Sequence, residues 1–390
     1  MGLFNRKNKG KSEDGTSEKK AGWKRPANTA FKQQRLKAWQ PILTPKTVLP
    51  TLFGISIVFA PIGALLIWGS GLVSEMTIDY TNCERQTSSS LDSPTFTRVP
   101  NYSYNLRASD SKASYEPPTF AYVNNTDREG FNETNQFQCL IQFDVPADFQ
   151  APVFLYYKLS NFYQNHRRYS KSLNSDQLKG DAKSADDLND SDCKPLGSID
   201  GKAVYPCGLI ANSVFNDTFS ILTTSDNSST YTFSEKGIAW PGEARKYVDR
   251  AGSDYRLDQI VPPPNWKKRY PDGYTEENFP NLRSDEHFQN WMRTAGLPTF
   301  TKLWGRNDGE DLPRGRYSIT IDMNFPVLPY KGTKSIVIST VSWIGGKNPF
   351  LGWAYVGASA LFMLLAILGT IRHVVKPRRL GDMSLLSWNR

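Results

Sequence analysis

The chain has 390 residues, with 47 Lys and Arg against 38 Asp and Glu, so its formal net charge at pH 7 is +9. Its apolar share of 39% is too low for a protein built mainly of membrane-spanning helices. Its 13% of aromatic residues and 22% of charged residues argue against a mostly disordered chain. Four Cys and three His, all well separated, leave little material for a zinc ribbon or a multi-metal site.

Two stretches, 47–74 and 348–371, contain no ionisable residue. Each is longer than the ~20 residues that a helix needs to cross about 30 Å of hydrocarbon. We therefore predict two transmembrane helices, because a buried helix of a soluble core rarely has so long an uncharged run. The first thirty residues have no apolar core of a signal peptide, so we expect the first span to act as an uncleaved signal anchor.

The charge distribution predicts the orientation in the membrane. Residues 1–46 hold 12 Lys and Arg against 3 Asp and Glu, and the tail 372–390 holds 5 against 1. The intervening segment 75–347 is slightly acidic, with 30 basic and 34 acidic residues. The positive-inside rule then places both basic flanks in the cytosol and the segment 75–347, the ectodomain, on the other side. A nucleic-acid-binding role is disfavoured because the basic residues are explained as topology determinants.

The ectodomain also holds the residues that are typical of an oxidising, glycosylating compartment. All four cysteines are there: Cys83, Cys139, Cys193 and Cys207. Four cysteines allow three pairings, and we favour neighbours in sequence, Cys83–Cys139 and Cys193–Cys207. Every Asn-x-Ser/Thr sequon is there too, and we expect glycosylation at Asn101, Asn124, Asn132, Asn189, Asn216 and Asn227.

Hydrophobic alternation predicts a mainly β ectodomain. Residues 316–325 and 139–145 alternate with period two, which indicates strands with one buried face. Residues 153–163 and 335–340 are further predicted strands. We expect one antiparallel, sandwich-like domain with helical insertions, among them a short helix at 284–292 with Ser284 as its N-cap. The polar stretch 171–191 is predicted to be an exposed loop.

No catalytic, cofactor-binding or metal-ligating residues are predicted. The sequence has no P-loop, no G-x-G-x-x-G after a strand, no G-x-S-x-G and no H-E-x-x-H. His166 lies between Asn165 and two arginines, Arg167 and Arg168, and fits a structural histidine beside a basic surface patch better than a catalytic base. The spans carry no ionisable residue for a proton or ion path.

Small residues recur in both spans, at Ala60, Gly63, Ala354 and Ala358. Such residues let helix backbones approach closely. Two interpretations remain open: the two spans pack on each other, or they dock against a larger membrane partner. Pro61 is expected to kink the first span.

Several ordered stretches carry a family resemblance. They lie at 28–45, 77–80, 161–169, 206–219, 262–266, 270–274, 290–293 and 345–348. Together they resemble the Cdc-fifty (ligand-effect modulator) family, whose members are the non-catalytic β-subunits of type-four P-type ATPases, the phospholipid flippases. The resemblance runs from about residue 28 to the tail. Lys347 stands where the family pattern has Arg, and the loop 84–137 matches no family motif, so the family supports the sequon at Asn216 but not those at Asn101, Asn124 and Asn132.

The resemblance implies a two-span protein with cytosolic termini and a glycosylated, disulfide-linked lumenal or extracellular domain. It implies a one-to-one complex with a catalytic ATPase. This chain would help the ATPase to fold and to leave the endoplasmic reticulum for the Golgi, endosomes or plasma membrane. It would also be needed for normal catalytic turnover of the ATPase. ATP and Mg²⁺ would be bound by the partner, and this chain would carry no cofactor besides N-linked glycans. Residues at the expected partner interface are Arg35, Trp39, Ala60, Gly63, Ala354, Ala358, His166, Arg167 and Arg168.

Two other classes share this architecture. A two-span ion channel or receptor subunit would have a large ectodomain, but such channels usually carry more than four ectodomain cysteines and a polar stripe that faces the pore. A membrane-tethered lumenal hydrolase would need a catalytic motif, which the sequence does not show. Stoichiometry distinguishes the first class, because a homotrimer indicates a channel and a complex with a much larger chain excludes it.

Overall fold

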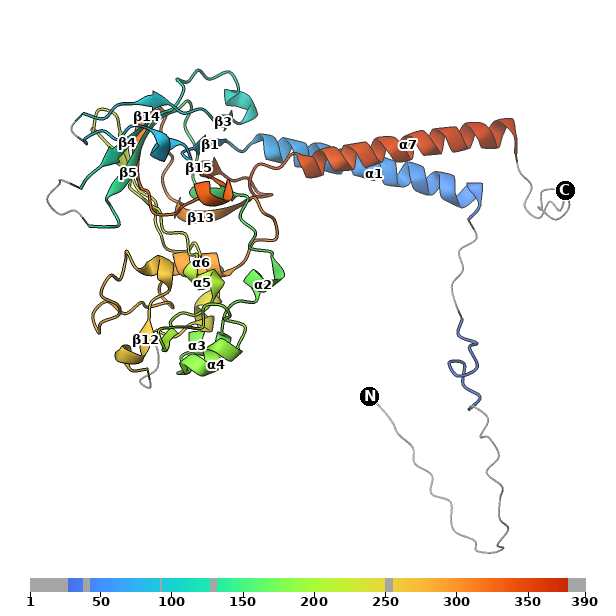
Figure 1. The fold of residues 1–390 in the computed structure, drawn as a ribbon. Helices are drawn as coiled ribbons and strands as arrows, with labels where there is room; N and C mark the ends of the chain where they lie inside the picture. The colour runs from blue at the N-terminus through green and yellow to red at the C-terminus, as the bar shows by residue number, and fades with distance from the viewer. Residues whose placement is uncertain (1–26, 38–42, 92, 127–131, 250–254, 378–390) are drawn as a thin grey trace, which may run out of the picture. The chain divides into compact units, whose positions relative to one another are not determined.

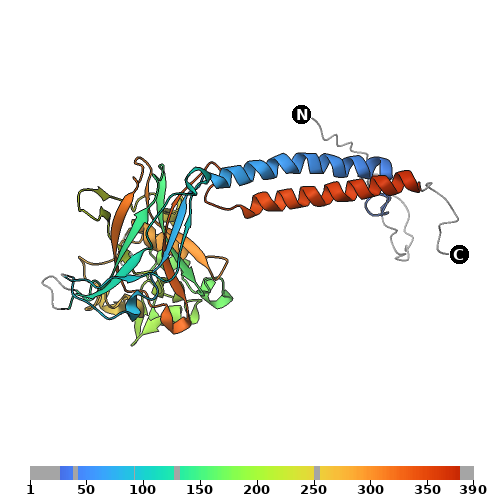
Figure 2. The same cartoon turned by 90° about the horizontal axis from the view of Figure 1, so that it is seen from above.

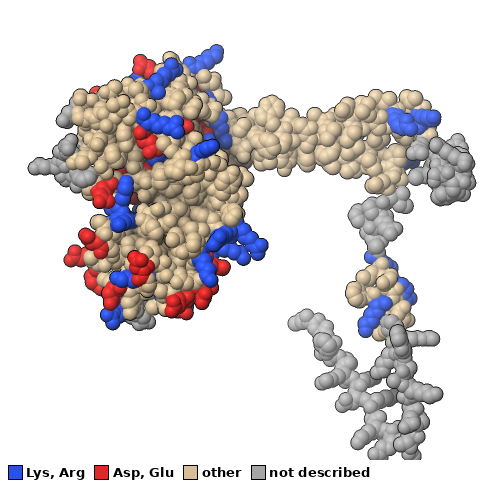
Figure 3. All heavy atoms as spheres, in the orientation of Figure 1, with Lys and Arg blue, Asp and Glu red and all other residues tan. Residues whose placement is uncertain are grey.

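The computed structural model describes residues 27–37, 43–91, 93–126, 132–249 and 255–377. The two long helices are α1 (Pro45–Gly71) and α7 (Phe350–Val375) (Figure 1). Only 17% and 11% of their most apolar windows are buried within the chain, whereas the core helix of a soluble protein would be mostly buried. The middle of the helix pair shows no Lys, Arg, Asp or Glu in Figure 3, as expected for two transmembrane helices.

The rest of the described chain is mainly β, as predicted. One five-stranded antiparallel sheet has the order β13-β6-β15-β1-β3. Its strands are β1 (Glu75–Asp79), β3 (Tyr102–Asn105), β6 (Val153–Ser160), β13 (Phe300–Asn307) and β15 (Thr333–Thr340). Strand β1 follows α1 and β15 precedes α7, so two adjacent inner strands of this sheet lead to the two spans.

A second antiparallel sheet has the order β11-β10-β14-β5-β4-β2, with β9 also paired to β14. Its strands are β2 (Thr97–Arg98), β4 (Thr119–Asn124), β5 (Phe137–Val145), β9 (Thr218–Phe219), β10 (Leu222–Thr224), β11 (Thr230–Tyr231) and β14 (Gly315–Asp322). Alternate residues of both sheets, such as Ile141, Ile319, Ile336 and Ile338, are buried in one hydrophobic core. The sheets therefore form the sandwich that the period-two patterns predicted (Figure 2).

A helical insertion with its own core occupies much of 161–297. Its helices are α2 (Arg167–Ser170), α3 (Ser175–Leu178), α4 (Ala185–Asp190), α5 (Leu209–Asn212) and α6 (Glu286–Met292). A small sheet of β7 (Ser198–Ile199), β8 (Lys202–Val204) and β12 (Ile260–Val261) packs with them. The short 3₁₀ helices of the described chain are η1 (Cys83–Arg85), η2 (Ala108–Asp110), η3 (Glu243–Lys246), η4 (Leu257–Gln259), η5 (Pro264–Trp266) and η6 (Leu328–Tyr330).

Two expectations about this insertion were wrong in detail. The stretch 171–191 is not a loop, because α3 and α4 lie within it and bury Leu178 and Leu188. The side chains of Asn174 and Ser184 cap these helices. The helix predicted at 284–292 exists as α6, but its N-cap is Asp285, whose carboxylate accepts a hydrogen bond from the amide of Phe288.

Both disulfides join the cysteines that are neighbours in sequence, the pairing favoured above. Cys83 is bonded to Cys139, with 6.1 Å between their Cα atoms, and Cys193 to Cys207, with 5.7 Å. Cys83 follows β1 of the first sheet and Cys139 lies in β5 of the second. The first disulfide therefore crosslinks the two layers of the sandwich.

Candidate partner interface

The two spans contact each other through a pair of glycines. A Cβ atom added to Gly63 would lie 2.9 Å from the carbonyl oxygen of Gly352 and 2.8 Å from Cγ2 of Val356. A Cβ atom on Gly352 would lie 2.6 Å from Cγ1 of Ile67 and 3.0 Å from the carbonyl oxygen of Gly63. The backbones of α1 and α7 are thus too close for any side chain at this crossing.

About two turns further into the span, two serines join the helices. The hydroxyl of Ser56 donates to the carbonyl of Ser359 at 2.9 Å, and the hydroxyl of Ser359 donates to the carbonyl of Ser56 at 2.8 Å. Both side chains are buried. In hydrocarbon, these reciprocal bonds satisfy hydroxyl groups that would otherwise lack partners. The ring of Phe59 packs on Tyr355 in the same contact.

The four small residues predicted at the partner interface differ in whether they face the other span. Gly63 is buried against α7, so packing of the two spans accounts for it within the described chain, and its place at a partner interface stays a prediction. Ala60 and Ala354 are exposed, and Ala358 is half-buried. Ala60 and Ala354 therefore lie on surfaces of the helix pair that the described chain leaves uncovered.

Lys347 ties the spans to the ectodomain. Its ammonium group donates to the carbonyls of Val73, Asn105 and Leu106 at 2.8–3.1 Å. Val73 ends the segment after α1, and the other two carbonyls lie at the end of β3. Burial lowers the pKa of Lys347, and the nearby Glu75 carboxylate opposes that shift. One cation thus fixes the exit of α1, the end of β3 and the entry to α7, a task for which three donors suffice and the fork of Arg is not needed.

The predicted basic residues lie where the loop after β6 enters α2, and this segment is called the 161–169 loop below. His166, Arg167 and Arg168 are all exposed. The loop is anchored below them: the side chain of Asn165 donates to the carbonyl of Gly296, and the amide of Ala295 donates to the side chain of Gln164. The exposed, positively charged patch is therefore held on an ordered base. Two large apolar side chains of these neighbouring segments, Tyr163 and Leu297, are also more than half exposed.

Two residues of the N-terminal segment, Arg35 and Trp39, were also predicted at the partner interface. Arg35 is exposed and its guanidinium donates to the side chain of Asn28. Trp39 lies outside the described residues.

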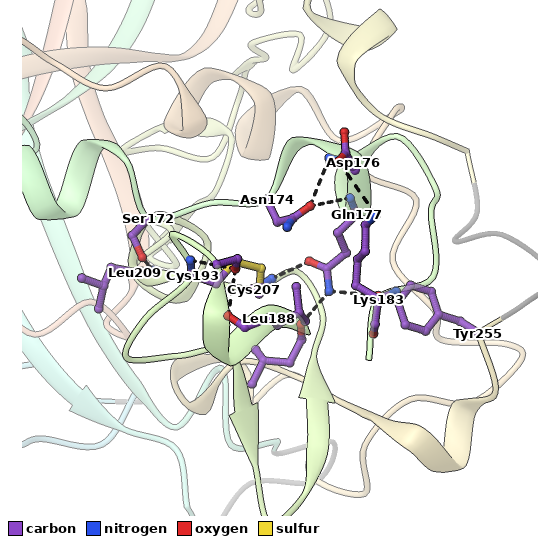
Figure 4. The surroundings of a disulfide bond; sticks show 12 residues. Ser172, Asn174, Asp176, Gln177, Lys183, Leu188, Cys193, Cys207, Leu209 and Tyr255 are labelled. Atoms are coloured by element: carbon purple, nitrogen blue, oxygen red, sulfur yellow. Dashed lines mark hydrogen bonds and ion pairs between the residues drawn. A yellow bond between two sulfur atoms is a disulfide. The ribbon is translucent and has the colours of Figure 1, made fainter. Parts of the chain in front are cut away.

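A buried glutamine supports the second disulfide (Figure 4). The side-chain oxygen of Gln177 accepts from the amide of Cys207 at 2.9 Å, and its nitrogen donates to the carbonyl of Val204. Gln177 and Cys193 are fully buried. The side chain of Gln177 therefore attaches α3 to the start of the motif 206–219, and the disulfide attaches the segment after α4 to the same place.

That motif ends at the sequon of Asn216, which is rigidly placed. The carboxylate of Asp217 is completely buried and accepts from the backbone amides of Asn324 and Phe325 at 2.6 Å and from the hydroxyl of Tyr80 at 2.9 Å. Burial, with a contribution from Asp217, raises the pKa of Tyr80 well above its usual range, so this hydroxyl stays protonated. Asn216 itself is half-buried and lines a cavity of about 650 Å³.

One family model matches most of the chain. The model of the LEM3 (ligand-effect modulator 3) family / CDC50 family matches residues 66–379, from within α1 to past the end of α7. The chain belongs to this family. The resemblance that the sequence motifs carried is thereby confirmed.

Curated relatives in this family are similar over the same extent. The chain is 42% identical to the phospholipid-transporting ATPase accessory subunit CDC50 of Chaetomium thermophilum, over 97% of this chain and 94% of that protein. It is 42% identical to the accessory subunit CRF1 of Saccharomyces cerevisiae, over 94% and 89% of the two chains. It is 38% identical to the accessory subunit LEM3 of the same yeast, over 94% and 87%.

Sequence reasoning missed the buried groups of this CDC50-family ectodomain. Lys334, Ile336 and Ile338 lie on the same face of β15, and that face is buried. A lysine in line with core residues is a sequence signal of a buried charge. Lys302 is also buried, in β13, and donates to the carbonyls at the end of α6. His287 could not have been singled out, because nothing in its sequence context distinguishes it from a surface histidine.

Proposed function

We propose that this chain is the accessory, non-catalytic subunit of a phospholipid-transporting P-type ATPase of the flippase class, with which it forms a one-to-one complex. The observation that carries the proposal is the end-to-end similarity to relatives that are named accessory subunits of such ATPases. ATP and Mg²⁺ are bound by the partner, and this chain contributes no cofactor of its own. No group of three or more His, Cys, Asp or Glu that could hold a metal occurs among the residues that the structure describes.

The proposed topology has both termini in the cytosol and the β-rich domain in the lumen or outside the cell. The basic flanks 1–46 and 372–390 support it through the positive-inside rule. Two disulfides and six sequons in the same domain support it as well, because both need the secretory compartment. On this topology the complex forms in the endoplasmic reticulum and travels to the Golgi, endosomes or plasma membrane.

The subunit acts on the ATPase through binding alone. A bound subunit changes the transport cycle only if its affinity differs between conformations of the ATPase. It also stabilises the folded ATPase by mass action, which is how it supports folding and export from the endoplasmic reticulum. The hydrogen bonds of Lys347 suit this role, because they join the exit of α1, the end of β3 and the segment that enters α7.

Three surfaces are proposed to meet the partner. In the membrane they are the exposed faces of the helix pair around Ala60, Ala354 and Ala358. Outside the membrane, the candidate is the anchored loop with His166, Arg167 and Arg168. In the cytosol, it is the basic segment that contains Arg35 and Trp39.

The test is a pull-down of the tagged full chain in mild detergent, followed by mass spectrometry and a vanadate-sensitive ATPase assay with added phospholipids. The expected result is a stoichiometric chain of P-type ATPase size whose activity depends on lipid. Recovery of the chain alone, or as a homo-oligomer without ATPase activity, contradicts the proposal and favours a channel or receptor subunit. An unrelated two-span protein with the same tag serves as the control for non-specific capture.

A further inference from the structure

A tight turn between β15 and α7 has two apolar residues at its tip. The amide of Ser342 donates to the carbonyl of Gly345 at 2.9 Å, and the amide of Gly345 donates back to the carbonyl of Ser342 at 2.9 Å. Trp343 and Ile344 therefore form the tip. Such positions usually hold Gly, Pro, Asn, Asp or Ser. A tip of Trp and Ile is unusual for a turn that faces water.

This turn is fixed to the last residues of α1. A Cβ atom added to Gly69 would lie 3.1 Å from Cδ1 of Ile344 and 3.1 Å from the indole nitrogen of Trp343. The amide of Asn348 donates to the hydroxyl of Ser70 at 3.0 Å. Gly69 and Ser70 are buried, whereas most of α1 is not. The turn is thus an ordered part of the end of the first span.

Trp343 extends outward from this base. Its side chain is 66% exposed, although the edge of its ring contacts Gly69. Gly69 lies two residues before the end of α1, which corresponds to about 3 Å along the helix axis. It also lies within the uncharged run 47–74. The indole therefore lies beside the membrane-spanning helix and not on the ectodomain above it.

The ends of the spans around this turn are apolar and uncharged. Trp68 near the end of α1 and Phe350 and Trp353 at the start of α7 are also more than half exposed. No ionisable residue occurs from 335 to 346. A large exposed apolar surface marks a site of interaction with a protein or a membrane. Here the surface continues that of the two transmembrane helices, and this continuity identifies lipid as its partner.

We propose that Trp343 inserts into the lipid leaflet on the ectodomain side and fixes the depth of the spans in the membrane. An indole ring combines a large apolar face with one N–H donor, and such rings favour the boundary between lipid headgroups and hydrocarbon. The turn holds the ring at the level of Gly69, so it gives the ectodomain a lipid contact besides the two helix ends. The proposal goes beyond the proposed function and requires only that the chain spans the membrane.

The test places a single fluorescent label on the full chain. All four native cysteines are bonded in two disulfides, so one introduced cysteine is labelled uniquely. Trp343→Cys carrying the fluorophore NBD is reconstituted in phosphatidylcholine nanodiscs, with and without a nitroxide near the headgroup end of the acyl chain. Trp240→Cys is the matched control, because Trp240 is 62% exposed on the helical insertion. Trp353→Cys, at a residue that is also 62% exposed but lies in α7, is the positive control.

We expect the nitroxide lipid to quench the label at 343 at least about twofold, as at 353, and to leave the label at 240 unchanged. Quenching at 343 as weak as at 240 overturns the proposal. The complex with the captured ATPase should give the same quenching at 343. Loss of quenching in the complex alone would show that a protein surface covers this turn, and it would overturn the lipid assignment while supporting the proposed function.

A measurement without a label excludes an effect of the introduced cysteine on the turn. Phosphatidylcholine with brominated acyl chains quenches tryptophans that contact the bilayer. Trp343→Phe, which keeps an aromatic ring at the tip, should lower the emission intensity that this lipid quenches, whereas Trp240→Phe should leave that intensity unchanged. An equal quenched intensity in Trp343→Phe and the wild type overturns the proposal and leaves the proposed function standing.

Discussion

The ammonium nitrogen of Lys334 lies 2.8 Å from carboxylate oxygen Oδ2 of Asp217, and both side chains are almost fully buried, with 1% and 0% of their surfaces exposed. Lys334 also donates to the carbonyl of Phe325. The pair joins the central strand β15 to the residue that follows Asn216. Burial of two charges costs free energy, and only the complete set of partners offsets that cost.

Replacement of one member of this pair should be severe. Lys334→Met leaves the Asp217 carboxylate buried without its cation, and we expect it to lower the free energy of unfolding by about 3–5 kcal/mol. The double variant Lys334→Met/Asp217→Asn should lose less than the sum of the single losses, because it removes both charges and keeps the sequon. Thermal unfolding of the purified protein in mild detergent measures this, and additive losses would contradict direct coupling between the two side chains.

The glycine crossing of the spans gives a second prediction. Gly63→Ala should destabilise the helix pair by about 1–3 kcal/mol, because the new methyl group meets the backbone carbonyl of Gly352, which cannot move aside cheaply. The matched control is Gly357→Ala in α7, where an added Cβ atom has no neighbour within 4 Å. Melting temperatures in the same detergent compare the two. Equal stability of both variants would show that the spans are not packed through Gly63.

How much of this architecture the sequence predicts depends on the length of each element. The strands β5 and β14 have nine and eight residues with one buried face, which is enough for a period-two pattern to be recognised, whereas β15 is buried on both faces and shows only as an Ile- and Val-rich run. The helices α3 and α4 have four and six residues, too few to show a helical period. Only the N-cap residues Asn174 and Ser184 indicate them in the sequence.

Some features of the candidate interface could be predicted from the sequence and others could not. Cysteines, sequons and uncharged spans are local features, so their presence could be predicted. Which face of α1 meets α7 could not, because Gly63 and Ala60 look alike until the partner helix is placed. The cavity at Asn216 is lined by segments far apart in sequence, among them 214–219 and 284–288, and no local pattern indicates that they meet.

The second disulfide should stabilise the helical insertion. The chain-entropy model assigns about 3 kcal/mol to a crosslink over a loop of this length, and Cys193 and Cys207 are separated by 14 residues. The double variant Cys193→Ser/Cys207→Ser, which leaves no unpaired thiol, should be cut faster by trypsin at Lys202 and should capture less ATPase. Unchanged proteolysis and capture would show that Gln177 alone holds this segment.

The buried Lys302 gives a pH prediction. Burial, with a contribution from Arg293, lowers the pKa of Lys302 to about 8 from an unfolded value of about 10.5. Between those values the unfolded chain binds more protons, so this group's contribution to stability rises with pH. The melting temperature of the wild type relative to Lys302→Met should therefore increase from pH 7.5 to pH 9.5. A constant or falling difference would mean that the carbonyls of Asn290 and Arg293, which accept from the ammonium group, keep the pKa near its usual value.

The exposed loop 161–169 gives the prediction that bears most directly on assembly. Arg167→Glu/Arg168→Glu reverses two exposed charges without touching the anchors of the loop at Gln164 and Asn165. If this patch meets acidic groups on the ATPase, the reversal replaces attraction by repulsion, and we expect about a tenfold weaker capture of the partner, with a larger loss at low ionic strength. The melting temperature of the isolated subunit should not change.

The matched control for this variant is Lys202→Glu/Lys267→Glu, which reverses two exposed charges beside the small sheet of the helical insertion. We expect it to capture the ATPase as the wild type does, because it alters net charge equally but leaves the 161–169 loop intact. Equal losses in both variants would mean that capture depends on the overall charge of the ectodomain. Capture unchanged in both would exclude the loop as a contact and direct attention to the exposed faces of α1 and α7, where Ala60→Phe and Ala354→Phe are the next variants to measure.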